Sequence, residues 1–292
     1  MRRKFNPLTD LQGFTLLEMI VVIVVTGIIG GTVAVFVRTP VQAYLDTVGR
    51  AALSDVGDLA LKRITRDLRT ALPNSVRVST VGTSTYVEFL QTRTGGRYRA
   101  VSDSTGLGDV LDFSAADTAF DTSQPLSVLT DEVILNTDRV VIYNLGIPGA
   151  DAYNGDNTSL ISSTAAGALA NEGRINFAAK QFPLASPGNR YQVISGPVTY
   201  GCDTGTGLIT RYWGYAIAAA QPTPPAGAGL STAVLVGETN GSLPLKVASC
   251  QFTNTNNVVA QRNGLVLMQL QLQKNNESVR LFQQVHVSNV LI

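Results

Sequence analysis

The chain has 292 residues, of which 45% are hydrophobic and 15% charged, and its formal net charge is +1 at pH 7. A chain of this length and apolar content can bury one sizeable hydrophobic core. It lacks the basic stripe that is typical of nucleic-acid-binding proteins, so we expect no nucleic-acid partner.

The N-terminal region combines a short polar stretch with a long apolar one. Residues 1–13 carry three basic side chains, those of Arg2, Arg3 and Lys4. Residues 14–37 follow and contain a single charged side chain, Glu18. As a helix, residues 14–37 would be roughly 36 Å long, which is enough to cross a bilayer. Because basic residues precede the span, we expect residues 1–13 in the cytoplasm and the C-terminal region outside it.

Glu18 is the unusual residue of this span. A carboxylate costs about 2.5–3.5 kcal/mol at the centre of a membrane helix and less toward the interface, so it usually has a partner. A new amino terminus, made by cleavage between Gly13 and Phe14, would supply one. A signal peptide is a poorer interpretation because its apolar core is shorter and precedes its cleavage site. A plain signal anchor leaves Glu18 unexplained.

A basic leader, Gly13, Phe14, Glu18 and an apolar helix in this order resemble the processing motif of type IV prepilins and type II secretion pseudopilins. In that family a membrane aspartyl peptidase cuts after the glycine and methylates the new N-terminal phenylalanine. The resemblance therefore implies cleavage between Gly13 and Phe14, N-methylation of Phe14 and an assembly role for Glu18. The implied partners are other pilins, through the N-terminal helix, the prepilin peptidase and the inner-membrane assembly platform.

The resemblance also implies an α+β, pilin-like fold. Its long N-terminal helix would have a transmembrane half (14–37) and a periplasmic amphipathic half (38–72), packed on an antiparallel β-rich domain (73–292). Processed in this way, the protein would stand in the inner membrane with its C-terminal domain in the periplasm until it joins a pilus or pseudopilus.

The amphipathic half begins near Pro40, which we expect to kink the helix. Beyond it, apolar residues recur at steps of three or four and share a face: Leu45, Val48, Ala52, Val56, Ala60, Ile64 and Leu68. We expect a sheet to cover this face, because Gly49 and Gly57 weaken the isolated helix. Asp58 with Lys62 and Arg63 with Asp67 are expected ion pairs on the solvated sides, and the helix should end near Leu72.

From Val76 onward, short β-branched and aromatic runs predict strands. We expect them at 86–90, 97–101, 110–113, 139–145, 191–194, 198–200, 208–217, 247–252, 265–273 and 279–287. The last two read as a hairpin with one buried face. Residues 146–173 and 219–229 are expected to be loops, and no stretch divides the domain in two.

Cys202 and Cys250 are the only cysteines, and both follow the membrane span. In an oxidising compartment an isolated pair favours a disulfide, which on the chain-entropy model would stabilise the fold by roughly 4 kcal/mol. A metal site lacks ligands, since His286 is the only histidine.

Four other groups are weaker candidates. Asp151, Asn154 and Asp156 are possible calcium ligands, but their spacing fits no EF-hand and solvated loop residues explain them better. Gly205-Thr206-Gly207 is too short for a phosphate-binding loop. Trp213, with Tyr212 and Tyr215, could form a sugar-binding platform, although aromatic residues on a strand more often belong to the core. His286 is expected on the polar side of the last strand.

These groups form no catalytic constellation: a Ser-His-Asp triad would have to use His286, and no nucleophile elbow occurs. We expect no enzymatic activity, no metal and no cofactor.

Three functions remain: a structural pilus subunit, an adhesin and a membrane-tethered periplasmic enzyme. The β-rich region of about 220 residues is larger than in major pilins, so the resemblance points to a minor pilin or a large minor pseudopilin. Residues 71–78, 196–202 and 285–290 resemble minor pilins of the mannose-sensitive haemagglutinin (MSHA) type. The J-type minor pseudopilin of type II secretion is the alternative.

Overall fold

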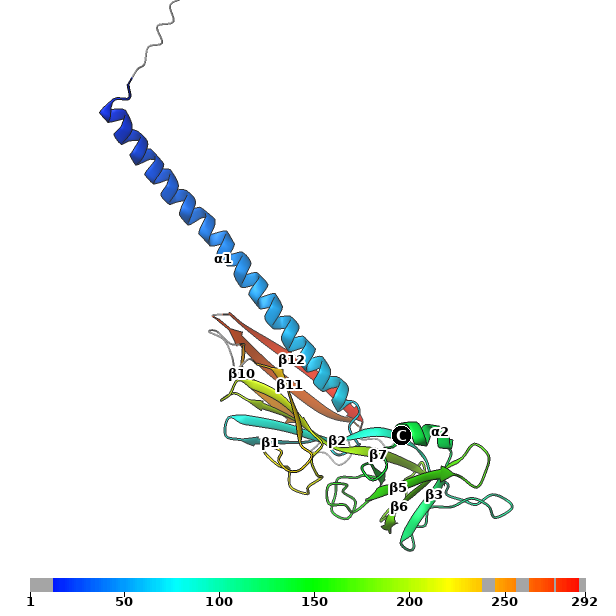
Figure 1. The fold of residues 1–292 in the computed structure, drawn as a ribbon. Helices are drawn as coiled ribbons and strands as arrows, with labels where there is room; N and C mark the ends of the chain where they lie inside the picture. The colour runs from blue at the N-terminus through cyan, green and yellow to red at the C-terminus, as the bar shows by residue number, and fades with distance from the viewer. Residues whose placement is uncertain (1–12, 238–244, 256–262, 276, 289–292) are drawn as a thin grey trace, which may run out of the picture. The chain divides into compact units, whose positions relative to one another are not determined.

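The computed structural model describes residues 13–237, 245–255, 263–275 and 277–288 (Figure 1). The predicted leader, apart from Gly13, therefore lies outside the described residues. The two helices of the described part are α1 (Leu16–Leu68) and α2 (Leu126–Glu132). Its strands are β1 (Arg77–Val81), β2 (Ser84–Arg97), β3 (Asp117–Thr122), β4 (Arg139–Ile142), β5 (Thr158–Ala166), β6 (Gly173–Lys180), β7 (Arg190–Asp203), β8 (Leu208–Trp213), β9 (Ser231–Val236), β10 (Lys246–Asn254), β11 (Asn263–Lys274) and β12 (Glu277–Ser288).

The chain divides into two compact units, one up to Ala51 and one from Ala52 onward, and α1 contributes to both. The described residues of the first unit form a helix from Leu16 that continues through Pro40. A proline removes only one backbone donor, and here the helix tolerates that loss without a break.

The larger sheet of the second unit is antiparallel throughout, with the order β1-β2-β7-β4-β5-β6-β3. The long strand β7 connects its parts: it pairs with β2 along one edge, and with β4 and then β8 along the other. β9 continues the sheet from β8. The two predicted strands at 191–194 and 198–200 are thus parts of one strand.

The smaller sheet has the order β10-β11-β12 and contains the predicted C-terminal hairpin. Val266, Met268, Leu270 and Leu272 are buried, while the glutamines between them are partly exposed. This alternation confirms one buried face, as the pattern predicts.

The end of α1 packs in the main core of the second unit. Its buried apolar residues are Leu53, Ala60, Leu61, Ile64 and Leu68. They share one cluster with side chains from β2 and β7 of the larger sheet and from all three strands of the smaller one. The fold is therefore α+β, with one long apolar N-terminal helix packed on an antiparallel β-rich domain.

The helix differs from the sequence prediction in three respects. Leu45, Val48 and Ala52 are exposed, so only the C-terminal part of the predicted face is covered. The Asp58–Lys62 pair is present, with 3.4 Å between Nζ and Oδ2, but Asp67 is buried and bonds to other partners. The helix also ends at Leu68 rather than at Leu72, because the chain then pairs with β2 through backbone hydrogen bonds.

Several strand predictions are wrong. Residues 98–101 and 110–113 lie outside strands. Their backbone forms isolated hydrogen bonds to several different segments and no continuous strand ladder. The predicted loop 146–173 contains β5, and the strands predicted at 139–145 and 208–217 end earlier, at Ile142 and Trp213. The sequence prediction also missed β1, β3, β6, β9 and α2.

Candidate functional site

The predicted processing segment lies at the start of α1. Gly13, Phe14 and Thr15 precede the helix, which begins at Leu16, and the side chain of Phe14 is 78% exposed. Glu18 lies in the first turn. The structure thus places the glycine–phenylalanine bond in accessible chain outside the helix.

Thr15 caps this helix at its N-terminus. The sequence prediction did not include this cap. The backbone N–H of Glu18 donates to Thr15 Oγ1 over 3.3 Å, and the N–H of Met19 donates to the Thr15 carbonyl over 3.2 Å. A threonine followed three residues later by glutamate is the sequence signal of a capping box. A carboxylate in the first turn also interacts favourably with the helix dipole. The cap shown by the structure is therefore made by Thr15, and Glu18 contributes its backbone N–H.

The helix is long and apolar enough to cross a membrane by length and composition. Two threonine hydroxyls of its apolar part, those of Thr26 and Thr32, are hydrogen-bonded within the helix itself. Thr26 Oγ1 donates to the carbonyl of Val22 over 2.6 Å, and Thr32 Oγ1 donates to that of Ile29 over 2.9 Å. These internal bonds remove the cost of placing an unpaired hydroxyl in a lipid environment.

The glycines of α1 fall into two kinds. At Gly27, Gly30 and Gly31 an added Cβ would meet no atom within 4 Å, so no contact with the described residues requires a glycine there. At Gly57 an added Cβ would lie 2.2 Å from Leu281 Cδ1 and 3.1 Å from Leu272 Cδ1. Gly57 is therefore a close contact between helix and sheet, whereas the three N-terminal glycines leave a bare helix surface.

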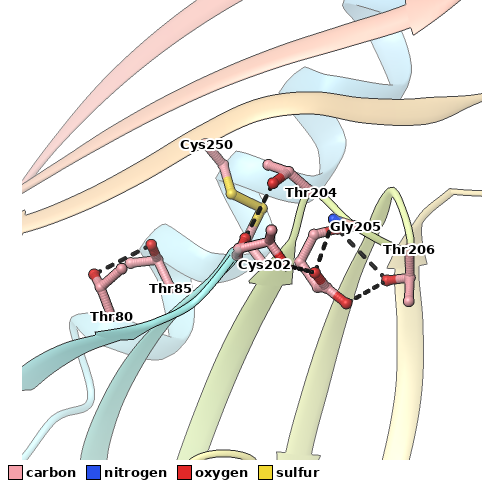
Figure 2. Close-up of a disulfide and its surroundings, with 9 residues drawn as sticks. Thr80, Thr85, Cys202, Thr204, Gly205, Thr206 and Cys250 are labelled. Carbon is pink, nitrogen blue, oxygen red and sulfur yellow. Dashed lines mark hydrogen bonds between the residues drawn. A yellow bond between two sulfur atoms is a disulfide. The ribbon is translucent and has the colours of Figure 1, made fainter.

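The predicted disulfide is present and joins the two sheets (Figure 2). Cys202 lies on β7 of the larger sheet and Cys250 on β10 of the smaller one, with their Cα atoms 6.5 Å apart. Because the two strands belong to different sheets, this bond fixes the smaller sheet to the larger one across the main core.

The segment Gly205-Thr206-Gly207 forms the turn between β7 and β8, organised by Asp203. The Asp203 carboxylate accepts hydrogen bonds from the N–H of Gly205 and the hydroxyls of Thr206 and Thr83, each over 2.9 Å. Burial alone would raise the pKa of Asp203, but the hydrogen bonds to its carboxylate have the larger effect and lower this pKa below its ordinary value. The turn therefore binds a carboxylate of its own chain.

The carboxylates of the candidate calcium residues accept hydrogen bonds from backbone N–H groups of their own loop. Asp156 Oδ2 accepts from the N–H of Gly149 and of Asp151, and Asp151 Oδ1 accepts from the N–H of Tyr153. Asn154 is exposed. Among the residues that the structure describes, no three or more His, Cys, Asp or Glu side chains gather as metal ligands.

The aromatic residues near the end of β8 do not form one platform. Tyr215 is buried, and its hydroxyl is hydrogen-bonded to that of Thr199. Trp213 is partly buried against the main core, and the guanidinium of Arg211 lies 4.6 Å from its ring centroid. Tyr212 is partly buried. The core interpretation describes these residues better, while His286 is exposed, as expected.

Sequence reasoning missed the buried carboxylates that pair with arginines, among them Asp67 and Glu88. Asp67 of α1 accepts from the hydroxyl of Tyr200 over 2.6 Å and from Arg211 Nε over 3.0 Å, which ties the helix to β7 and β8. Glu88 of β2 is fully buried and bonds to Arg77 over 2.7 Å. Burial raises the pKa of Glu88, although Arg77 opposes this shift. Arg77 and Glu88 face each other because β1 pairs with β2, and the sequence prediction did not include β1. Nothing in the sequence indicated the partners of Asp67.

Comparisons with protein-family models, curated proteins and solved structures find no significant match to this chain.

Proposed function

We propose that this protein is a minor, pilin-like structural subunit of a type IV pilus of the MSHA type. A prepilin peptidase cuts it between Gly13 and Phe14 and methylates Phe14. The mature protein then packs its N-terminal helix against the helices of other pilins. The observation that carries the proposal is the fixed register of Gly13, Phe14 and Glu18 at the start of a membrane-length helix.

The exposed cleavage region supports this role. Gly13 and Phe14 precede the helix, so a peptidase can bind them in extended form without first unwinding a helical turn. A peptide bond inside a hydrogen-bonded helix would have to be released before cleavage.

The glycines of the membrane segment support helix packing between subunits. Gly27 and Gly31 lie four residues apart, and no contact in the part of the chain that the structure describes explains them. Small residues at this spacing let helix backbones approach closely in membranes. The alternative, a segment that stretches within the fibre, uses the same glycines, since each weakens the helix by about 1 kcal/mol.

Glu18 is proposed to accept the charged terminal amine of a neighbouring Phe14, a charge-assisted contact that would set the axial register between subunits. Glu18→Gln tests this charge, because glutamine still fits a capping box. We expect normal cleavage but impaired incorporation into pili, measured by immunoblots of sheared fibres. Thr32→Val is the control, since it removes a polar group of the same helix and keeps Glu18. Normal incorporation of Glu18→Gln would refute the assembly role.

The J-type minor pseudopilin of type II secretion is the second candidate, because it would also combine this helix with a large β domain. A deletion strain scored for surface pili and for secreted enzymes separates the two. Lost pili with normal secretion supports the MSHA-type role, and the converse selects the pseudopilin.

A further inference from the structure

A pocket of about 430 Å³ opens on the second unit, apart from the processing segment and the disulfide. It lies where β4, the bulged part of β7, the loop before β5 and the loop after β8 meet. Its volume is in the lower part of the range of about 300–1,000 Å³ that is typical of small-ligand sites. The pocket is therefore of a size to hold a small molecule or one unit of a polymer.

Two backbone features shape the walls. Ser195 is an extra residue in β7 relative to β2, since Gln91 pairs with Gly196 and Thr92 with Ile194. Such bulges often redirect side chains next to binding sites. On the opposite loop, Gly214 has φ +80°, and a Cβ there would lie 2.5 Å from the Gly229 carbonyl oxygen. This wall is held in a conformation that only glycine fits.

Arg139 is the only charged residue among the described residues that line the pocket. It lies on β4, and its Nε donates to Thr158 Oγ1 over 3.1 Å. No carboxylate of the described chain lies within ion-pair distance of it, whereas the preceding Asp138 pairs with Arg93 over 2.8 Å. With Nε held by Thr158, the two terminal nitrogens form a fork that matches a carboxylate.

The remaining lining is polar without being charged. Thr137 and Asn154 are exposed at the pocket, and the rings of Tyr153 and Tyr215 line it. The hydroxyls of both tyrosines bond inside the domain, to the Ser75 carbonyl and to Thr199, and both residues are buried, so the pocket meets only a small part of each side chain. Hydroxyl and amide groups next to aromatic carbon suit a hydroxylated ring.

The charges of the lining residues restrict the chemical class of the ligand further. No described carboxylate lines the pocket, so the ammonium of an amino acid would be left without a counter-charge. A neutral sugar would desolvate the Arg139 fork without supplying an anion. A sugar that carries a carboxylate satisfies both the fork and the hydroxyl-binding groups.

We propose that this pocket binds an acidic sugar, with Arg139 as the carboxylate-binding residue. The carboxylate accepts from the two terminal nitrogens of Arg139, and the sugar hydroxyls bond to the threonine and asparagine side chains at the pocket. The inference does not depend on the proposed pilus role, because it concerns binding by the protein itself.

The test is calorimetric titration of the full-length protein in detergent micelles with the methyl glycosides of glucuronic acid and N-acetylneuraminic acid. The methyl glycoside of glucose and sodium acetate serve as probes of the ring and of the carboxylate alone. We expect saturable binding of at least one acidic glycoside, and weaker binding of the other two probes. The proposal would be overturned if the glucoside bound as tightly as the acidic glycosides, or if neither acidic sugar showed saturable binding.

Arg139→Gln should weaken the binding about tenfold to a hundredfold, since it removes a charge-assisted pair of hydrogen bonds. Arg280→Gln is the matched control, because it removes the same charge from the exposed side of β12, outside the pocket lining. Thr137→Tyr, which adds bulk at an exposed lining position, should also reduce binding while melting as the wild type does. Wild-type affinity in both pocket variants would refute the assignment.

Discussion

At the scale of single residues, the second unit depends on carboxylates that the fold buries and then satisfies. Asp121 on β3 is fully buried. It accepts from Arg174 Nε over 2.7 Å and from the backbone N–H of Asp109 and Ala168. Burial alone would raise its pKa, but these bonds outweigh it and hold the pKa of Asp121 below its ordinary value.

This shift gives a pH-dependent prediction. Because the folded-state pKa of Asp121 is lower than the unfolded one, its charge stabilises the fold above the unfolded pKa, and this contribution is lost as the pH falls through the folded pKa. Asp121→Asn should lower the free energy of unfolding by about 2–3 kcal/mol at pH 7, since it leaves Arg174 and the backbone donors poorly paired. In denaturant titrations, the difference in the free energy of unfolding between Asp121→Asn and wild type should become smaller below about pH 4.

Asp131→Asn is the control for this experiment, because Asp131 is exposed on α2. It should change the free energy of unfolding by less than about 0.5 kcal/mol. A difference between Asp121→Asn and wild type that stays constant down to pH 2 would contradict the role assigned to the charge.

Sequence reasoning predicted the disulfide because the chain has only two cysteines. The roles of Gly13, Phe14 and Glu18 stay predictions. The capping signal of Thr15 was present in the sequence, although the prediction did not use it. Asp67 was placed on the solvated side because its spacing from Arg63 suggested a helical pair. Its true partners, Tyr200 and Arg211, are more than 130 residues away, and no local pattern indicates them.

At the scale of elements, Gly57 is a position where α1 lies close against the smaller sheet. Gly57→Leu should lower the free energy of unfolding by about 1–3 kcal/mol, because the added side chain would overlap Leu281 and crowd Leu272. Gly49→Leu is the matched control, since a Cβ there meets nothing within 4 Å and leucine favours the helix by up to about 1 kcal/mol. Thermal unfolding in detergent micelles should therefore move in opposite directions for the two variants. Equal shifts would show that Gly57 is no packing contact.

The disulfide is the covalent link between the two sheets. Cys250→Ser removes the bond but leaves the buried sulfur of Cys202 in the core, so it isolates the effect of the cross-link. We expect a loss of about 2–4 kcal/mol in the free energy of unfolding, measured by denaturant titration. If the variant unfolds at the same denaturant concentration as the wild type, the link does not stabilise the fold.

The strands show which patterns the sequence carries. The C-terminal hairpin was predictable because apolar residues alternate with glutamines from Met268 to Gln273. β5 reads Thr-Ser-Leu-Ile-Ser-Ser-Thr-Ala-Ala, which lacks such alternation, and β3 contains two aspartates that usually argue against a strand. The fold tolerates Asp121 there because Arg174 on β6 pairs with it. The pocket around Arg139 draws on four separate segments, so it could not be read from sequence at all.

At the scale of the whole molecule, the chain combines a helix of membrane length with a β-rich unit that carries its own core, disulfide and pocket. The first unit has glycines and apolar side chains that no described contact within the chain requires. In the second unit the buried carboxylates of Asp67, Glu88 and Asp121 are each paired with an arginine of the same unit. This division is what we expect of a subunit that assembles through its helix and presents a stable domain.

The central claim is that the chain is processed between Gly13 and Phe14, because cleavage creates the amine that Glu18 is proposed to bind. Mass spectrometry of the N-terminal peptide from the cell-derived protein tests it most directly. We predict a peptide that begins with N-methylated Phe14, and an unprocessed chain for the Gly13→Leu variant. A wild-type peptide that still begins at Met1 and retains residues 1–13 would contradict the account.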